Sequence, residues 1–207
     1  MGLLDFFTKP KKTKGLIGYF GLESWWLSEF TDDERQHIAR TFQPLGSSGG
    51  SLTSGNISHS SQTAVGLLRN LAGWFSKEKD RPIAHKLLEK AEELSESEDS
   101  VLDAHFLFGQ KLEIYYKDRK TPGYLEAAVE ACNQQIALSV KAAQEFRREY
   151  RGSQLPSHKG YQQLAIIFEK QGKFDETIEL CCKAKEQGWA GDWEKRIERC
   201  RRKSDRE

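Results

Sequence analysis

The sequence predicts an all-α protein in which short helices follow one another in pairs. Apolar residues recur with helical spacing along most of the 207 residues, and no segment alternates with the period of two that a strand requires. Glycine and proline interrupt the helical stretches near residues 120–123 and 151–157. The same spacing of large and small residues also occurs at two places in the chain, which indicates a repeated helical pair.

The N-terminal helical segment is predicted over residues 1–43. Thr31 and Glu34 have the spacing of a capping box, in which each side chain accepts a hydrogen bond from the backbone amide of the other residue. A helix should begin there and run to about Gln43. Its buried face would carry Ile38 and Phe42.

Two aromatic and apolar features precede this helix. Trp25 and Trp26 are adjacent and cannot face one helical stripe together, so we interpret them as packing between two surfaces rather than as a ligand site. Leucines and phenylalanines at residues 3–7 precede lysines at residues 9–14, a pattern that can dip into an anionic membrane surface. Phe6 occupies the position where a myristoylation motif has Ser or Thr. Because so short a tip buries little area, we expect it to dock on protein and any membrane contact to be weak.

A loop or flexible linker is predicted over residues 44–61, PLGSSGGSLTSGNISHSS, because the stretch is rich in Gly and Ser and poor in apolar residues. It would separate the N-terminal segment, residues 1–43, from a helical domain over residues 62–207.

The clearest helical pair is YQQLAIIFEKQGKFDETIEL, residues 161–180. One face of its first helix carries large residues, namely Tyr161, Leu164, Ala165 and Phe168. Gly172 then ends that helix, because glycine tolerates a positive φ. The second helix presents mostly small residues where two helices cross closely, namely Phe174, Thr177, Cys181 and Ala184.

The same pattern occurs earlier in the chain without a gap. The first helix repeats it with Leu68, Leu71, Ala72 and Phe75, and the second with Ala84, Leu88 and Ala91. Asp80 is expected to cap the second helix, with Pro82 in its first turn, where proline is tolerated. The turn differs, because Lys79 and Arg81 stand where the later pair has Gly172 and Phe174.

One enlarged pair is expected between these two. Its first helix is predicted over residues 101–119, and its second is predicted as a single long helix from residue 124 to about residue 150. After the last pair, residues 193–203 carry Trp193, Ile197 and Cys200 on one narrow apolar stripe. Such a stripe with charged residues elsewhere is typical of a helix that caps a repeat array.

From about residue 62 to the C-terminus the chain resembles the tetratricopeptide-repeat superfamily, on the two patterns just described. The resemblance implies a tetratricopeptide-like helical repeat array, a right-handed α-solenoid of about three helix pairs plus the capping helix. It also implies a protein–protein interaction module, either an adaptor or a subunit of a complex, that binds a peptide or helix in its concave groove.

In that superfamily the concave face is lined by first-helix residues outside the packing positions. Carried over to this chain, the candidate binding residues are Arg69, Gly73, Ser76, Gln162, Ile166 and Glu169. The family's carboxylate clamp has a Lys and an Asn at the first two of these positions. Arg69 and Gly73 occupy them here, so no carboxylate clamp is expected.

Catalytic and cofactor chemistry has no matching motif. The five histidines and four cysteines show no metal-ligand spacing, and the sequence has no GxSxG, phosphate-loop or GxGxxG motif. We therefore expect no enzyme activity, catalytic residue, metal, cofactor or small-molecule ligand. The net charge of +1, and the acidic side chains among the C-terminal arginines, argue against a nucleic-acid partner.

The expected location is the cytoplasm. The cysteines have no disulfide-type framework, no apolar run reaches the length of a transmembrane helix, and the first residues do not form a signal-peptide pattern. Two alternatives to the interaction module stay open. One is a peripheral membrane protein held by the N-terminal apolar and lysine-rich tip, and the other is a non-catalytic subunit of an enzyme complex.

Overall fold

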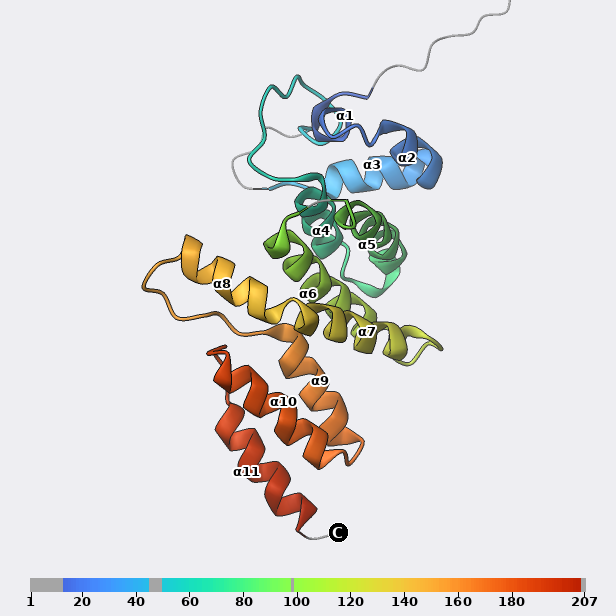
Figure 1. Cartoon of the computed structure of the whole chain (residues 1–207). Helices are drawn as coiled ribbons and strands as arrows, with labels where there is room; N and C mark the ends of the chain where they lie inside the picture. The colour runs from blue at the N-terminus through green and yellow to red at the C-terminus, as the bar shows by residue number, and fades with distance from the viewer. Residues whose placement is uncertain (1–12, 45–49, 98, 206–207) are drawn as a thin grey trace, which may run out of the picture. The chain divides into compact units, whose positions relative to one another are not determined.

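The computed structural model describes residues 13–44, 50–97 and 99–205 (Figure 1). Over these residues the chain is all-α, as predicted, with eleven α-helices, one short 3-10 helix and no β-sheet. The chain divides into two compact units, Met1–Leu67 and Leu68–Glu207, and the boundary falls within α4 (Ala64–Trp74). The predicted apolar tip and its lysines up to residue 12 lie outside the described residues.

The N-terminal unit contains α1 (Gly15–Tyr19), α2 (Glu23–Glu29) and α3 (Asp32–Thr41). The capping box of Thr31 and Glu34 is confirmed, and α3 ends two residues before the predicted end. Trp26 is buried with its ring centre 5.1 Å from that of Phe30, and the half-buried Trp25 lies 5.4 Å from the same ring. The two indoles therefore pack on one phenylalanine, as expected of core residues.

The described part of the Gly/Ser-rich stretch packs against α1. Leu52 is 1% exposed, and the amides of the first three residues of α1 donate to the carbonyls of Gly55, Ser51 and Leu52 at 3.0 Å. These amides have no partner within their own helix, so the loop supplies the hydrogen bonds that a helix N-terminus lacks. Gly15, the first residue of α1, has a φ of +65°, and a Cβ there would lie 2.5 Å from the Ser51 carbonyl oxygen. From Gly50 to Gly55 the stretch is thus a loop that packs and hydrogen-bonds onto α1, rather than a flexible tether.

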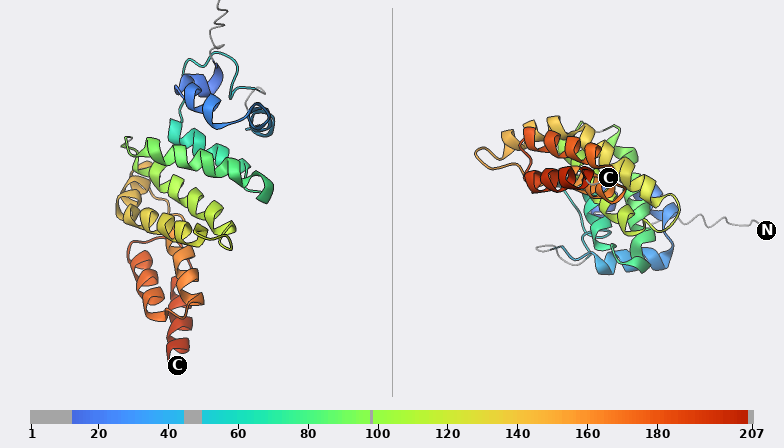
Figure 2. Two further views of the ribbon diagram at one scale, coloured as in Figure 1. Left: turned by 90° about the vertical axis from the view of Figure 1, so that its right-hand side faces the viewer. Right: turned by 90° about the horizontal axis from the view of Figure 1, so that it is seen from below.

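The second unit continues from α4 through the 3-10 helix η1 (Glu78–Asp80) into seven further helices. They are α5 (Arg81–Ser95), α6 (Val101–Lys117), α7 (Tyr124–Ala137), α8 (Ser139–Glu149), α9 (Lys159–Lys170), α10 (Phe174–Glu186) and α11 (Trp193–Ser204). Packing is largely sequential: α5 contacts α6, α6 contacts α7, α9 contacts α10 and α10 contacts α11. The left view of Figure 2 shows α9, α10 and α11 next to one another, in orange to red. No helix of the described residues is both long enough and apolar enough to cross a membrane.

The predicted inner faces of the two similar helical pairs are buried, with one exception. The exception is Phe168, the last residue of the predicted inner face of α9. It is half-buried and packs at the margin of a cluster around Leu112 and Leu164. Gly172 ends α9 with a φ of +74°, as predicted. Asp80 stands at the N-cap of α5 without a side-chain cap hydrogen bond.

The prediction of one long helix from residue 124 to about residue 150 is wrong. The helix breaks at Leu138, whose ψ of −9° departs from the helical value, and continues as α8. No glycine or proline marks this point. Two tertiary contacts accompany the break: the hydroxyls of Ser139 and Tyr161 lie 3.4 Å apart, and Phe146 of α8 packs edge-on against Phe106 of α6 at 5.6 Å. Packing, rather than a local helix-breaking residue, therefore accounts for the bend.

Candidate functional site

The candidates on α4 lie beside α6. The guanidinium carbon of Arg69 is 5.2 Å from the centre of the Phe106 ring, a cation–π contact. A Cβ on Gly73 would lie 3.7 Å from the side chain of Gln110, in ordinary contact. Ser76 follows the end of α4, half-buried, and its carbonyl accepts a hydrogen bond from an arginine of α5. Arg69 and Gly73 thus share a surface with α6, whereas Ser76 belongs to the turn.

Arg69 is partly withdrawn from water. Its Nε atom is buried without a hydrogen-bond partner among the described residues. Burial lowers the pKa of the guanidinium, and the Asp103 carboxylate opposes that effect. A cation held in this way over an aromatic ring can recognise an anionic or carbonyl group, because part of its hydration is already removed.

Sequence reasoning missed two residues of this surface, Phe106 and Gln110. The middle pair lacks the spacing of large and small residues that identifies the other two, so no position of α6 was assigned to a binding face. One signal was nevertheless present. Phe106 is an aromatic residue in an otherwise polar stripe that continues through Gln110, Glu113 and Lys117, and it is 39% exposed.

The candidates on α9 lie apart from those on α4, on another helix. Gln162 and Ile166 are half-buried, and the ends of their helix contact α6 through polar side chains. Lys159 Nζ lies 2.7 Å from Glu113 Oε1, and Lys170 Nζ donates to the Tyr116 hydroxyl at 3.4 Å. Helix α6 therefore contacts both helices that carry candidates, α4 and α9.

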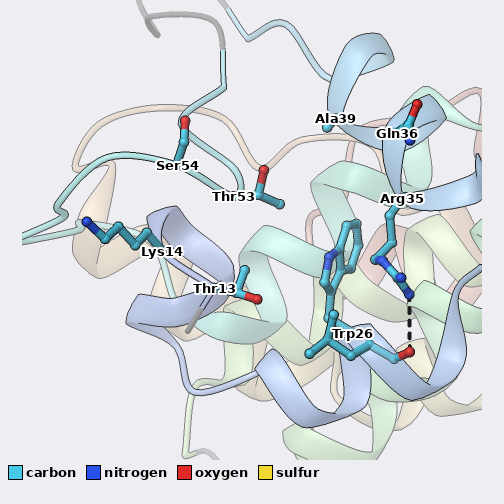
Figure 3. Close-up of a pocket in the computed structure, with 9 residues that line it drawn as sticks. Thr13, Lys14, Trp26, Arg35, Gln36, Ala39, Thr53 and Ser54 are labelled. Atoms are coloured by element: carbon cyan, nitrogen blue, oxygen red, sulfur yellow. Dashed lines mark hydrogen bonds between the residues drawn. The ribbon is translucent and has the colours of Figure 1, made fainter. Parts of the chain in front are cut away.

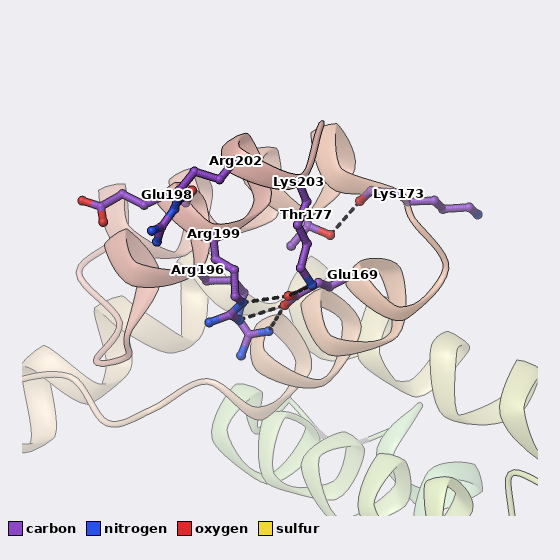
Figure 4. A network of polar contacts seen from close by, with 8 residues as sticks. All are labelled: Glu169, Lys173, Thr177, Arg196, Glu198, Arg199, Arg202 and Lys203. Atoms are coloured by element: carbon purple, nitrogen blue, oxygen red, sulfur yellow. Dashed lines mark hydrogen bonds and ion pairs between the residues drawn. The ribbon is translucent and has the colours of Figure 1, made fainter. Parts of the chain in front are cut away.

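Glu169, the last candidate, faces α11 (Figure 4). Its carboxylate accepts from Arg199 through Nε at 2.7 Å and Nη2 at 2.8 Å, a two-point contact. Arg196 Nη1 donates at 2.8 Å and Lys203 Nζ at 2.9 Å. The three cations lie three and four residues apart on α11, which places them on one face of that helix.

These contacts stabilise the charged carboxylate strongly. The hydrogen bond from Arg199, followed by that from Lys203 and the charges of both, lowers the pKa of Glu169 to about 2, against the opposing effect of burial. The Glu169 side chain is 11% exposed. Its carboxylate is therefore occupied in joining α9 to α11 and has little capacity left for a ligand.

The N-terminal unit holds an open pocket of about 590 Å³ (Figure 3). Trp26 lies in its wall, with polar side chains from α3 and from the loop at residues 53–54. Arg35 Nη1 donates to the carbonyls of Leu27, at 3.1 Å, and of Phe30, so the guanidinium caps the C-terminal end of α2. Lys14 extends away from Trp26 in this view. The cation nearest the indole thus has a structural role, and the pocket holds no acid–base pair among its described residues.

A pair of buried histidines lies between α6, α9 and the segment before α11. The rings of His105 and His158 are 5.0 Å apart, and Trp189 stacks on His105 at 5.6 Å with an interplanar angle of 7°. His158 Nδ1 accepts from the Tyr161 amide, which places the proton of the neutral ring on Nε2. Burial lowers the pKa of His105 to about 4 and that of His158 to about 3, where the neighbouring His105 adds to the effect. Both rings are therefore neutral core residues near pH 7.

A third histidine, His85, joins α5 to the end of α6. Its Nε2 lies 2.9 Å from Asp118 Oδ2, and Arg81 Nε donates to the other oxygen of the same carboxylate at 2.7 Å. The His85 ring packs 4.8 Å from the rings of both Tyr115 and Tyr124. Asp118 thus holds two side chains of α5, which is a structural arrangement.

Among the described residues, no three His, Cys, Asp or Glu side chains are grouped so that they can hold a metal ion. Comparisons of the chain with protein-family models, with curated proteins and with solved structures find no match.

Proposed function

We propose that this chain is a tetratricopeptide-like interaction module that binds a peptide or helix of a partner protein across α4, α6 and α9. The observation that carries the proposal is the burial shared by two helical pairs. In α4 with α5, and again in α9 with α10, residues at matching positions fill the inner faces, as the superfamily pattern requires. The sequential packing of the helices is the arrangement from which such arrays are built.

The chemistry of the half-buried and exposed residues on the first-helix face supports a polypeptide partner. Arg69 over Phe106 offers a cation beside an apolar ring, Gln110 and Gln162 offer amides, and Ile166 offers apolar contact. A surface of this kind suits an amphipathic helix or a peptide with mixed side chains. Glu169 would contribute indirectly, by fixing α11 against the helix that carries Gln162 and Ile166.

The first experiment is affinity purification of the full chain from its native host at physiological salt, with mass spectrometry of the proteins that co-elute. A stoichiometric partner is expected. The purified partner is then titrated against Arg69→Glu combined with Gln162→Arg, which should abolish binding while circular dichroism shows an unchanged helical content.

A matched control carries the same charge changes on exposed positions elsewhere, Lys195→Glu with Asn133→Arg. It should bind the partner as the wild type does. Full-strength binding by the Arg69/Gln162 variant, or equal losses in both variants, would refute the groove.

A further inference from the structure

A small apolar pocket lies between the end of α8 and the segment that leads to α9. Its volume is about 260 Å³, below the usual size of a site for a drug-like molecule. The pocket is lined by Phe146, Tyr150, Ser153, Gln154, Leu155 and Pro156. None of these side chains is charged. The pocket therefore suits a single large apolar side chain rather than a whole cofactor.

Aromatic rings form one wall and extend from it across the surface. Phe146 is 6% exposed, and its ring centre lies 5.6 Å from Phe106, 5.8 Å from Trp189 and 6.1 Å from Tyr150. Two of these rings remain open to water, Phe106 at 39% and Tyr150 at 56%. Exposed aromatic residues beside an apolar pocket are typical of the centre of a protein–protein interface.

The opposite wall is a non-helical segment that is held in place. Leu155 is 6% exposed, Ser157 forms a parallel bridge with Ala190, and the Ala190 amide donates to the Pro156 carbonyl at 3.2 Å. The side chain of Gln154 is exposed. Within the described chain, the main-chain groups of Gln154 and Leu155 form no hydrogen bond with the protein. One side of this segment is thus paired with residue 190, while main-chain donors and acceptors beside the pocket are unused.

We propose that the segment at Gln154 and Leu155 is a docking edge for an extended peptide of a partner protein, which pairs with the main-chain groups of these two residues and inserts one large apolar side chain between Phe146 and Tyr150. An added strand gains affinity from main-chain hydrogen bonds and specificity from a pocket for alternate side chains. This edge provides both features within a few residues. The proposal does not depend on the groove across α4, α6 and α9.

The charge near the pocket identifies the peptide further. Arg147, Arg148 and Arg151 are exposed on the last turn of α8 and just after it, with one exposed acidic residue among them, Glu149. Arg147 is bound to the Gln187 carbonyl at 2.7 Å, Arg148 pairs with Glu145, and Arg151 has no partner among the described residues. The peptide should therefore carry an acidic residue beside its apolar anchor. The chain's own apolar tip is disfavoured as the occupant, because lysines follow it in sequence.

The test is selection of random peptides displayed on phage against the full chain, followed by titration of the enriched peptides against Tyr150→Asp. Tyr150 is exposed, so this variant should keep the fold, and Tyr19→Asp is the control at another exposed tyrosine. Enriched peptides should share a large apolar residue with an acidic neighbour. Their affinity should fall about tenfold or more on Tyr150→Asp, fall less on Arg151→Glu, and stay unchanged on Tyr19→Asp.

A backbone-methylated copy of the best peptide tests the strand itself, since N-methylation removes main-chain donors and keeps the side chains. Its affinity should drop about tenfold. Equal binding of the methylated copy would overturn the strand, and failure to enrich any peptide that loses affinity on Tyr150→Asp would overturn the site. Peptides that bind Tyr150→Asp normally, but are lost on Arg69→Glu with Gln162→Arg, would support the groove and refute this edge.

Discussion

Replacing Glu169 with Gln tests whether one carboxylate holds α11 to the rest of its unit. Glutamine keeps the size of the side chain and removes its charge, which leaves Arg196, Arg199 and Lys203 close together without an anion. The pKa of Glu169 falls from an ordinary 4.5 to about 2. At about 1.4 kcal/mol per pKa unit, the contacts favour the folded state by roughly 3 kcal/mol near pH 7. Because water reaches part of the carboxylate and screens these charges, we expect a loss of about 2 kcal/mol.

Urea unfolding at pH 7, followed by circular dichroism, measures this loss, and the melting temperature should fall by about 4–8 °C. Glu179→Gln is the matched control, because Glu179 pairs only with the exposed Lys183 one turn away. It should leave the melting temperature unchanged. The folded state lowers the pKa of Glu169, so its contribution is complete above about pH 4.5 and declines as the pH falls toward 2. Equal stability of Glu169→Gln and Glu179→Gln at pH 7 would refute the reasoning.

Two further predictions concern the histidine pair and the start of α1. The pKa values of His105 and His158 are lowered in the folded protein, so the two rings bind protons at a higher pH in the unfolded chain. The free energy of unfolding should therefore decline as the pH falls below about 6.5. The loss at pH 5 should be about 2 kcal/mol per histidine, and His105→Phe should halve the slope of unfolding free energy against pH. An unchanged slope would show that the pair is not buried as described. Gly15→Ala should destabilise the N-terminal unit by more than about 2 kcal/mol, because the new Cβ meets the loop backbone. Gly21→Ala, at a similar φ of +67° but with open space around it, should cost only about 1 kcal/mol in the same thermal melts, so equal effects would exclude the close contact.

Local patterns predicted most of the individual helices. The capping box at Thr31, the glycine at residue 172 and the narrow stripe on α11 each rest on interactions within a few residues, so the sequence alone was sufficient. The break at Leu138 was not predictable in this way. It accompanies contacts with residues far away in sequence, and neither glycine nor proline stands beside it.

The candidate site was predicted less well than the helices. Glu169 was selected as a groove residue from its position in the predicted repeat, although the cations that surround it belong to a later helix. The spacing of Arg196, Arg199 and Lys203, which places them on one face of a helix, is nevertheless visible in the sequence. Phe106 was missed for the opposite reason. Its importance comes from Arg69 and Phe146, which other helices bring to it.

The loop that closes over α1 has a consequence for how the chain is made. The amides of α1 donate to carbonyls about 40 residues later in the chain. Closing the intervening loop therefore costs roughly 3 kcal/mol of free energy, through lost chain entropy, before α1 is completed. During synthesis, α1 emerges from the ribosome well before Ser51 and Leu52 do. The pairs of the second unit, by contrast, join neighbouring helices and can form as each pair emerges. Helix α1 therefore remains incomplete until residues 51–55 have been synthesised, and a fragment ending at residue 43 should lack a stable α1.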